Sequence, residues 1–211
     1  TPKETFINIH EVRRPDLDRF LFGPEDLIVP VGQDGLVANV AKYLAGQPVL
    51  GVNPSPDLYD GILVRVSVRH LSDLLRASTA GRAPTERRTM VEARLDTGER
   101  LLALNEVFVG HRSHQSARYS ITVGEGHEDH SSSGLIVASG TGATGWARSI
   151  MESIGTHLPL TPEERAVAYF VREPFPSIAT GTSLRAGKLA GEPIEVTSRM
   201  NDGGVIFADG M

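Results

Sequence analysis

The stretch that most constrains the fold of this chain is a strand–turn–helix–strand pattern in its first quarter. An apolar segment at 27–31 runs into the tight turn Gly32-Gln33-Asp34-Gly35, and apolar residues then recur at helical spacing over 36–44. A second short apolar segment follows at 48–53. This order is typical of a βαβ unit, and open α/β sheets bind ligands at the carboxyl ends of their strands. We therefore predict an N-terminal α/β domain with Asp34 at its ligand-binding edge.

Asp34 itself has two interpretations from the sequence. A carboxylate at the start of a helix can act as an N-cap, because it accepts a free backbone N–H and suits the helix dipole. The same position also suits a functional carboxylate that accepts a proton from a substrate hydroxyl. Turn residues of this type are common, so the stretch alone leaves both interpretations open.

Charge and composition exclude several classes of protein. The 211 residues carry a net charge of −5 and contain no long run of Lys and Arg, which argues against a nucleic-acid partner. The absence of Cys excludes disulfides and thiolate metal sites and is compatible with a cytoplasmic location. No apolar run has the length of a membrane span and no signal peptide is recognisable, so we expect no membrane partner.

The distribution of patterns predicts two domains, α/β over 1–83 and β-rich over 84–211, with a linker at 80–85. A doubly wound domain normally has a further strand and helix before residue 27, so we expect the first domain to be truncated. That domain also offers a candidate strand at 6–10, a strand at 62–66 and short helices at 15–22 and 68–76. For the second domain we predict one helix at 145–154 and strands at 88–95, 101–109, 117–123, 135–139, 166–171, 194–198 and 205–208.

The pair Asn105-Glu106 interrupts the strongly apolar segment 101–109. Burying an unpaired amide costs roughly 2–7 kcal/mol and a charge costs more, so two adjacent polar groups here suggest a use. An Asn amide suits the edge of a purine or of a nicotinamide amide, and Glu106 could accept a hydrogen bond from a ribose. The alternative is a strand end, where both side chains simply reach water.

A second candidate is the loop Gly140-Thr-Gly-Ala-Thr-Gly145, which lies between a predicted strand and a helix. It satisfies the G-x-G-x-x-G pattern of dinucleotide-binding dehydrogenases, but no acidic strand end follows at the expected distance of about 20 residues. Its small residues and the hydroxyls of Ser139, Thr141 and Thr144 still allow close approach to a nucleotide at a helix N-terminus. The alternative is an ordinary tight turn.

Four histidines form two H-x-x-H pairs, which raises the question of a metal site. The pairs lie on no predicted helix, and His127 and His130 fall in the polar segment 123–133. We predict solvated loop histidines and no metal site. The histidines are His111, His114, His127 and His130.

In this order the motifs resemble the NAD kinase family. The family has a Gly-Gly-Asp-Gly turn where this chain has 32–35, an Asn-Glu pair at 105–106, and a Thr-Gly-Ser-Thr-Ala-Tyr loop similar to 141–146. Four further stretches look closest to the mitochondrial-type branch, and the resemblance extends from about residue 27 to the end. These stretches are 132–135, 140–142, 171–174 and 207–210.

The resemblance implies a Rossmann-like α/β domain followed by a β-sandwich domain, usually in a homo-oligomer, for which we expect a dimer. It implies phosphorylation of the adenosine ribose 2′-hydroxyl of NAD by ATP with Mg²⁺, with Asp34 as the general base. It assigns the phosphate donor to Gly32, Gln33 and Gly35. The NAD contacts that it implies are Gly35, Asn105, Glu106, Ser133, Thr141, Gly142, Ala143 and Thr144.

Two residues depart from the family pattern at the phosphate turn. Gln33 stands where the family has a second Gly, and Leu36 stands where a Thr usually follows. Both changes bear on the phosphate donor more than on NAD. Gln33 supports the alternative of an NAD-binding sensor without kinase activity. A lipid or small-molecule kinase of the same superfamily is a further alternative.

Overall fold

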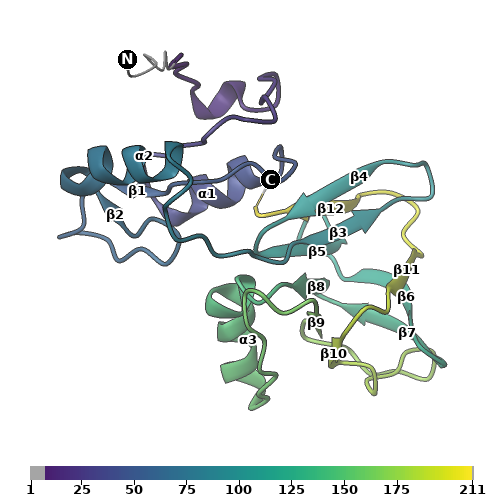
Figure 1. Ribbon diagram of the computed structural model, residues 1–211. Coiled ribbons are helices and arrows are strands. Elements are labelled where there is room, and N and C mark those ends of the chain that lie inside the picture. The colour runs from purple at the N-terminus through teal and green to yellow at the C-terminus, as the bar shows by residue number, and fades with distance from the viewer. Residues whose placement is uncertain (1–7, 211) are drawn as a thin grey trace, which may run out of the picture. The chain divides into compact units, whose positions relative to one another are not determined.

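The computed structural model describes residues 8–210, which form a mixed α/β structure with several small sheets and few helices (Figure 1). The chain separates into two compact units, Thr1–Ala83 and Pro84–Met211. The candidate strand at 6–10 lies partly outside the described residues, and residues 8–10 have no regular structure. Among residues 8–210, no helix is both long and apolar enough to cross a membrane.

The first unit is built on short parallel strand segments. Ile28 and Val31 form parallel bridges to Val49 and Val52, and β1 (Val52–Asn53) pairs in parallel with β2 (Val66–Ser67). Helix α1 (Asp34–Ala41) connects the first two segments and buries its apolar side, so the predicted βαβ connection is present. The remaining helices of this unit are η1 (Arg14–Asp16), η2 (Val68–His70) and α2 (Leu71–Thr79).

Several expectations for the first unit are wrong in detail. Of the helix predicted at 15–22, only residues 15 and 16 are helical, as part of the short η1. Helix α1 ends at Ala41 rather than near residue 44. The apolar segment 62–66 is a strand only at its last residue, because the backbone N–H groups of 62–64 donate to the side chain of Asp34 and so are not available to a sheet ladder.

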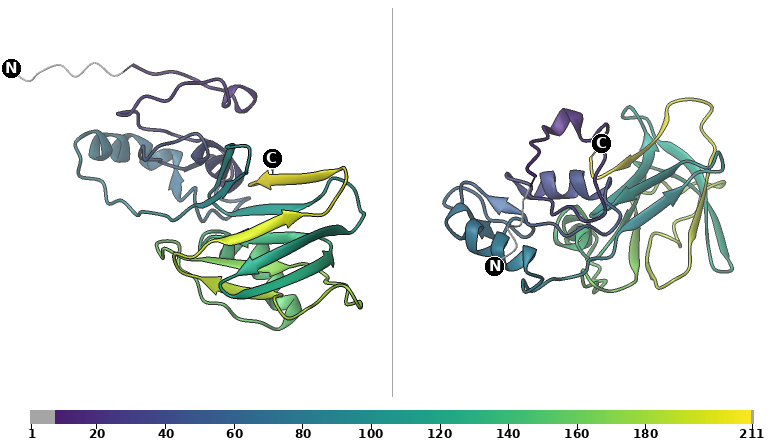
Figure 2. Two further views of the ribbon diagram at one scale, coloured as in Figure 1. Left: turned by 90° about the vertical axis from the view of Figure 1, so that its right-hand side faces the viewer. Right: turned by 45° about the horizontal axis from the view of Figure 1, so that its top comes forward.

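The second unit contains a five-stranded antiparallel sheet of order β10-β9-β8-β5-β12, a three-stranded antiparallel sheet of order β11-β6-β7, and the hairpin β3-β4. Figure 2 shows these strands from two further directions. The strands are β3 (Val91–Arg94), β4 (Arg100–Ala103), β5 (Glu106–His111), β6 (Ala117–Val123), β7 (Gly126–Ser132), β8 (Leu135–Ala138), β9 (Val167–Val171), β10 (Ala186–Leu189), β11 (Ile194–Ser198) and β12 (Gly204–Ala208).

Strand β8 shows how the core of this unit is divided. Its four residues are all buried, and successive side chains point to opposite faces of the sheet. Leu135 and Val137 pack in a core shared with the three-stranded sheet and the β3–β4 hairpin. Ile136 and Ala138 pack in a second core with helix α3 (Trp146–Ile154), which follows the short turn η3 (Gly142–Thr144). The loop from Ser139 to Gly145 therefore joins a fully buried strand to a helix that covers it.

The sequence missed two strands and one break in this unit. The polar segment 126–132 is strand β7 rather than a loop, so the prediction of solvated loop histidines is wrong for His130. Its side chain is fully buried and its ring stacks on Tyr119. Strand β10 was not predicted, and the segment 101–109 is broken at residues 104 and 105 between β4 and β5.

Candidate functional site

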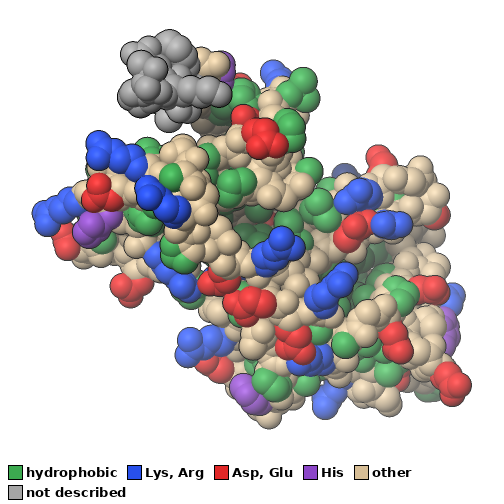
Figure 3. All heavy atoms as spheres, viewed as in Figure 1, with side chains coloured by type: hydrophobic (Ala, Val, Ile, Leu, Met, Phe, Trp, Pro, Cys, Tyr) green, Lys and Arg blue, Asp and Glu red, His purple; other side chains and the backbone are tan. Residues whose placement is uncertain are grey.

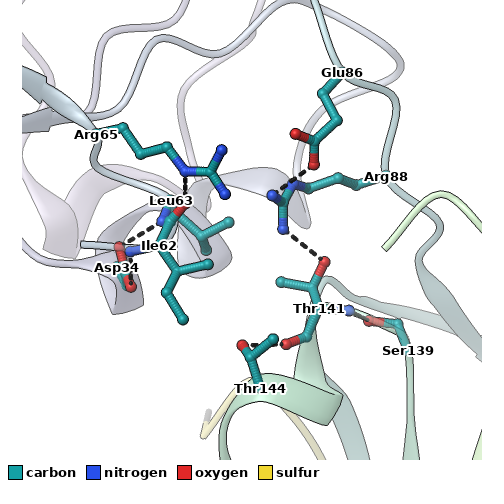
Figure 4. A network of polar contacts seen from close by, with 9 residues as sticks. All are labelled: Asp34, Ile62, Leu63, Arg65, Glu86, Arg88, Ser139, Thr141 and Thr144. Atoms are coloured by element: carbon teal, nitrogen blue, oxygen red, sulfur yellow. Dashed lines mark hydrogen bonds and ion pairs between the residues drawn. The ribbon is translucent and has the colours of Figure 1, made fainter. Parts of the chain in front are cut away.

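The Asp34 carboxylate binds backbone rather than capping its helix. Gln33 occupies the N-cap position of α1 and Asp34 is the first helical residue. The carboxylate accepts hydrogen bonds from three consecutive N–H groups, those of Ile62 (2.9 Å), Leu63 (2.8 Å) and Val64 (3.0 Å) (Figure 4). The N-cap interpretation is therefore wrong. An ionised carboxylate offers about four acceptor positions, so these three bonds leave one for a further donor.

Val64, the last residue of the segment that Asp34 holds, lines a small pocket of about 280 Å³ in the first unit. The pocket lies where β1 and β2 end, since Asn53 and Ser67 are the last residues of those strands. Carboxyl ends of parallel strands are the usual ligand edge of an α/β sheet. The other lining residues are Pro56, Tyr59, Asp60, Gly61 and Arg65.

The turn that precedes α1 accommodates the departure at Gln33 without strain. Gln33 has φ −92° and ψ 168°, which is extended backbone open to any residue, and its side chain is exposed. A Cβ on Gly35 would meet nothing within 4 Å. The glutamine therefore adds a polar side chain at the surface of the turn and does not distort its backbone.

In the second unit, the Asn105-Glu106 turn is bound by a residue that the sequence did not single out. The carboxylate of Asp209, just beyond β12, accepts the N–H groups of Leu104 (2.8 Å), Asn105 (2.8 Å) and Glu106 (3.2 Å). The N–H of Asp209 donates in return to the Glu106 carbonyl at 3.1 Å. The only sequence signal for Asp209 was the stretch 207–210 that resembles the family. Both side chains of the Asn-Glu pair are half-buried at this turn.

The same turn is joined to the loop after β8 through Ser139. The Ser139 N–H donates to the Asn105 carbonyl at 2.8 Å, and its buried hydroxyl donates to the Leu104 carbonyl. That hydroxyl also accepts the N–H groups of Thr141 (3.1 Å) and Gly142 (3.3 Å). The structure thus brings the two polar segments of the second unit together. Within residues 84–210 it connects Asn105, Glu106, Thr141 and Gly142 as neighbours.

Two further contacts fix the loop. The half-buried Arg88, whose side chain is 16% exposed, donates from Nη1 to the Thr141 hydroxyl at 3.1 Å and pairs through Nη2 with Glu86 at 2.6 Å (Figure 4). The Thr144 hydroxyl donates to the Thr141 carbonyl at 2.8 Å and so closes its own turn. Sequence reasoning missed Arg88, which lies in a segment expected only to begin a strand.

Glu106 carries the strongest electrostatic perturbation in this cluster. Burial, and secondarily the nearby charge of Asp209, raise the pKa of Glu106 to about 7. At neutral pH its carboxyl is therefore partly protonated and can either donate or accept a hydrogen bond.

Ser133 lies outside the cluster formed by the Asn105-Glu106 turn and the Ser139–Thr144 loop. It is exposed and precedes β8, whereas Ser139 follows β8. At about 3.3 Å per residue, the six residue steps from 133 to 139 span about 20 Å. The structure therefore leaves Ser133 at the opposite end of β8 from Asn105 and Thr141.

Trp146, the single tryptophan of the chain, begins α3 beside the loop. It is 41% exposed, its ring stacks with Phe108, and the Arg172 guanidinium lies 5.2 Å from its centre. A partly exposed indole in this position is a built-in fluorescence reporter for the loop.

The surface charges are mixed and the described residues hold no cluster of metal ligands. On the face drawn in Figure 3, Lys and Arg alternate with Asp and Glu without a large patch of one sign. Within residues 8–210, no three His, Asp or Glu side chains are grouped as ligands of a metal ion. A hollow of about 1410 Å³ in the second unit is lined by aliphatic and charged residues of β3, β4, β5, β11 and β12 and by none of the loop 139–145.

Comparison with curated proteins points to one enzyme family. The NAD kinase of Heliobacterium modesticaldum is 40% identical over 132 residues, which are 59% of this chain and 46% of that protein. The NAD kinase of Polaromonas naphthalenivorans is 29% identical over 157 residues, 70% of this chain and 53% of that protein. The chain thus spans about half the length of the curated relatives it matches. No family model matches it.

Two solved structures share the fold. Yeast NADH kinase, complexed with NADH, has a TM-score of 0.64 at 22% identity and aligns over 88% of this chain and 54% of that chain. An NAD kinase from Archaeoglobus fulgidus, in complex with ATP, has a TM-score of 0.65 at 21% identity over 92% and 70% of the two chains. The fold is therefore of the NAD(H) kinase type. In sequence, the matched segments are similar to NAD kinases over about half the length of those proteins.

Proposed function

We propose that the chain carries NAD kinase activity, the ATP-dependent phosphorylation of the adenosine ribose 2′-hydroxyl of NAD to give NADP. The observation that supports this most is the junction of the Asn105-Glu106 turn with the Ser139–Thr144 loop. These two segments are separated in the sequence, yet Ser139 ties them together by hydrogen bonds. Such a junction offers the Asn105 amide and the Glu106 carboxyl to a nucleotide. The chain is also 40% identical to an NAD kinase over 132 residues.

In the proposed mechanism, Asp34 orients and deprotonates the 2′-hydroxyl for in-line attack on the γ-phosphate of ATP. Its carboxylate has one acceptor position beyond the three bonds to 62–64, which is what one hydroxyl requires. We assign Gly32, Gln33 and Gly35 to the phosphate donor. Mg²⁺ is assigned to the ATP phosphates, where it neutralises their charge.

NAD itself is assigned to the second unit and to Gly35. Asn105 and Glu106 would contact the purine or nicotinamide edge and a ribose, while Thr141, Gly142, Ala143 and Thr144 allow close approach of the backbone. Gly142 supports this assignment, since a Cβ there would collide with the Asn105 carbonyl oxygen. The assignment of Ser133 rests on resemblance alone.

Finer features are also part of this proposal. The parallel segments with α1 between them support a Rossmann-like first domain, and the core shared by two sheets supports a β-sandwich second domain. We further propose a cytoplasmic homodimer, closest to the mitochondrial-type branch. These last points rest on the family resemblance.

The test is a coupled assay of NADP formation from NAD, ATP and Mg²⁺, run beside the Asp34→Asn variant. We expect NADP formation by the unmodified chain and a loss of at least about 100-fold in the variant, since general-base catalysis contributes about 10²–10⁴-fold. Trp146 fluorescence measures NAD binding in parallel. No NADP above the Asp34→Asn background contradicts kinase activity, and an active Asp34→Asn variant contradicts the role of Asp34.

The second candidate is an NAD-binding sensor without phosphoryl transfer. It is favoured by the exposed Gln33 and by Leu36, which replace a glycine and a hydroxyl at the turn assigned to the phosphate donor. NAD-dependent quenching of Trp146 with neither ATP binding nor NADP formation supports the sensor. Tight ATP binding with turnover rules it out.

A further inference from the structure

The end of β12 is tied to the Asn105-Glu106 turn by one residue, Asp209. Its carboxylate accepts three consecutive backbone N–H groups and its own N–H donates to the Glu106 carbonyl, which makes four hydrogen bonds. To do so Asp209 adopts φ +50°, a conformation that Asp tolerates better than most side chains.

Together Asp209 and Ser139 satisfy the backbone of the turn completely. The donors of 104–106 point to the Asp209 carboxylate, and the carbonyls of Leu104 and Asn105 accept from Ser139. The Glu106 carbonyl accepts from the Asp209 N–H. A half-buried turn with every backbone group paired is held in one conformation, because any other would leave buried polar groups unsatisfied.

We propose that Asp209 is a positioning residue for NAD: it holds the Asn105-Glu106 turn so that both side chains face the ligand in a fixed geometry. This inference rests on the proposed function for the identity of the ligand. Asp209 acts through the turn, since its carboxylate is occupied by backbone. Its negative charge has a second effect: burial is the main cause of the raised pKa of Glu106, and the charge of Asp209 adds to it by disfavouring a further negative charge.

Three variants test the inference. Asp209→Ala removes all three acceptor bonds. Asp209→Asn keeps an oxygen at the place of Oδ1, which can still accept the N–H groups of Asn105 and Glu106. At the place of Oδ2 it puts an NH₂ group, which cannot accept the N–H of Leu104. The exposed Asp202→Asn is the matched control, since it removes a carboxylate from the same C-terminal segment outside the turn.

The first readout needs no ligand. Hydrogen exchange of the backbone amides, followed by NMR, should accelerate about tenfold or more at residues 104–106 in Asp209→Ala, and mainly at Leu104 in Asp209→Asn. The pH midpoint of the Glu106 carboxyl should fall in Asp209→Asn, because a neighbouring negative charge has gone. Asp202→Asn should match the unmodified chain in both measurements.

The second readout is kinetic. A binding geometry shared by ground state and transition state affects KM and not kcat, so we expect KM for NAD to rise about tenfold with kcat within about twofold. Should Asp209→Ala fail to fold, Asp209→Asn carries the test. A folded variant that exchanges at 104–106 like the unmodified chain, or one whose KM for NAD is unchanged despite faster exchange, overturns the inference. If the unmodified chain neither binds nor phosphorylates NAD, the proposed function is overturned instead. The two ligand-free measurements, amide exchange at 104–106 and the pH midpoint of Glu106, then still decide whether Asp209 holds the turn.

Discussion

Gly142 packs so closely on the carbonyl oxygen of Asn105 that no Cβ fits between them. The approach is backbone against backbone, so no flexible side chain can move aside. It joins the loop after β8 to the turn before β5, and both segments belong to the proposed NAD site. The glycine is thus required by contact rather than by an unusual φ.

Replacing Gly142 by Ala should separate the two segments. We expect a loss of about 1–3 kcal/mol in the free energy of unfolding and a matching loss of NAD binding, because the loop must shift to admit a methyl group. Urea denaturation and Trp146 fluorescence titration measure the two effects. Gly204→Ala is the control, since the nearest atom there is the flexible Met200 Cε at 3.3 Å. Unchanged stability and NAD binding in Gly142→Ala would show that the contact is dispensable.

Ser139 offers a second way to loosen the same junction. Its buried hydroxyl makes one donor bond and accepts two N–H groups, so Ser139→Ala leaves the Thr141 and Gly142 amides without that partner. We expect a cost of about 1–3 kcal/mol and faster hydrogen exchange of those two amides. The exposed Ser149→Ala on α3 should change stability by less than about 0.5 kcal/mol. Equal effects of the two variants would contradict this account.

The sequence predicted the elements whose patterns are local and missed those decided by distant partners. Alternating apolar residues located 117–123 and 194–198, which are β6 and β11. Strand β7 was missed because its residues are mostly polar and it is paired with β6 along its whole length. The break at 104–105 was missed because the residue that binds it, Asp209, lies just beyond β12, at sequence separations of 105 and 104 residues.

The candidate site shows the same division. Asn105, Glu106 and the loop 139–145 could be found because polar or small residues interrupt apolar segments. Arg88 and Asp209 carry no such signal, since a single charged residue near a strand end is ordinary at a surface. The partners of Asp34 could not be inferred from sequence either. An apolar segment predicts a strand, and nothing local shows that its N–H groups donate to a carboxylate 28 residues away.

Glu106 should make stability depend on pH in a defined direction. Its pKa is raised from 4.5 to about 7, so between these values the folded chain binds more protons than the unfolded chain. The free energy of unfolding contributed by Glu106 is therefore full below about pH 4.5 and is lost as the pH rises through about 7. Glu106→Gln does not titrate and so does not show this loss. The free energy of unfolding of the variant minus that of the unmodified chain should therefore increase by on the order of 1–3 kcal/mol between pH 4.5 and pH 8. Denaturation curves at both pH values measure it, and a constant difference would contradict the raised pKa.

His130 should act in the opposite direction. Burial lowers the pKa of His130, although Glu128 at 3.1 Å and Asp129 partly oppose the shift. As the pH falls, His130 is protonated in the unfolded chain before it is protonated in the folded chain. The contribution of His130 to the free energy of unfolding is therefore complete above about pH 6.5 and decreases as the pH drops toward the lowered pKa. His130→Gln stays neutral and should lose less stability between pH 7.5 and 5.5. The exposed His114→Gln should follow the unmodified chain, and the same pH dependence in all three proteins would refute this role for His130.

Asp34 allows its two proposed roles, anchoring the 62–64 segment and accepting a proton, to be separated. Both Leu63 and Val64 donate to Oδ1, and the amide oxygen of Asp34→Asn can still accept from them, whereas Asp34→Ala removes all three bonds. We expect amide exchange at Leu63 and Val64 to stay slow in Asp34→Asn and to accelerate in Asp34→Ala, which should also lose about 1–3 kcal/mol of stability. The exposed Asp57→Asn controls for a lost surface charge. If Asp34→Asn keeps these amides protected and yet makes no NADP, the carboxylate is needed for proton transfer and not only for anchoring. The alternative outcome is that Asp34→Asn, with protected amides, makes NADP, while Asp34→Ala, with exposed amides, does not. Asp34 then acts only by anchoring the 62–64 segment, and another residue must be the general base.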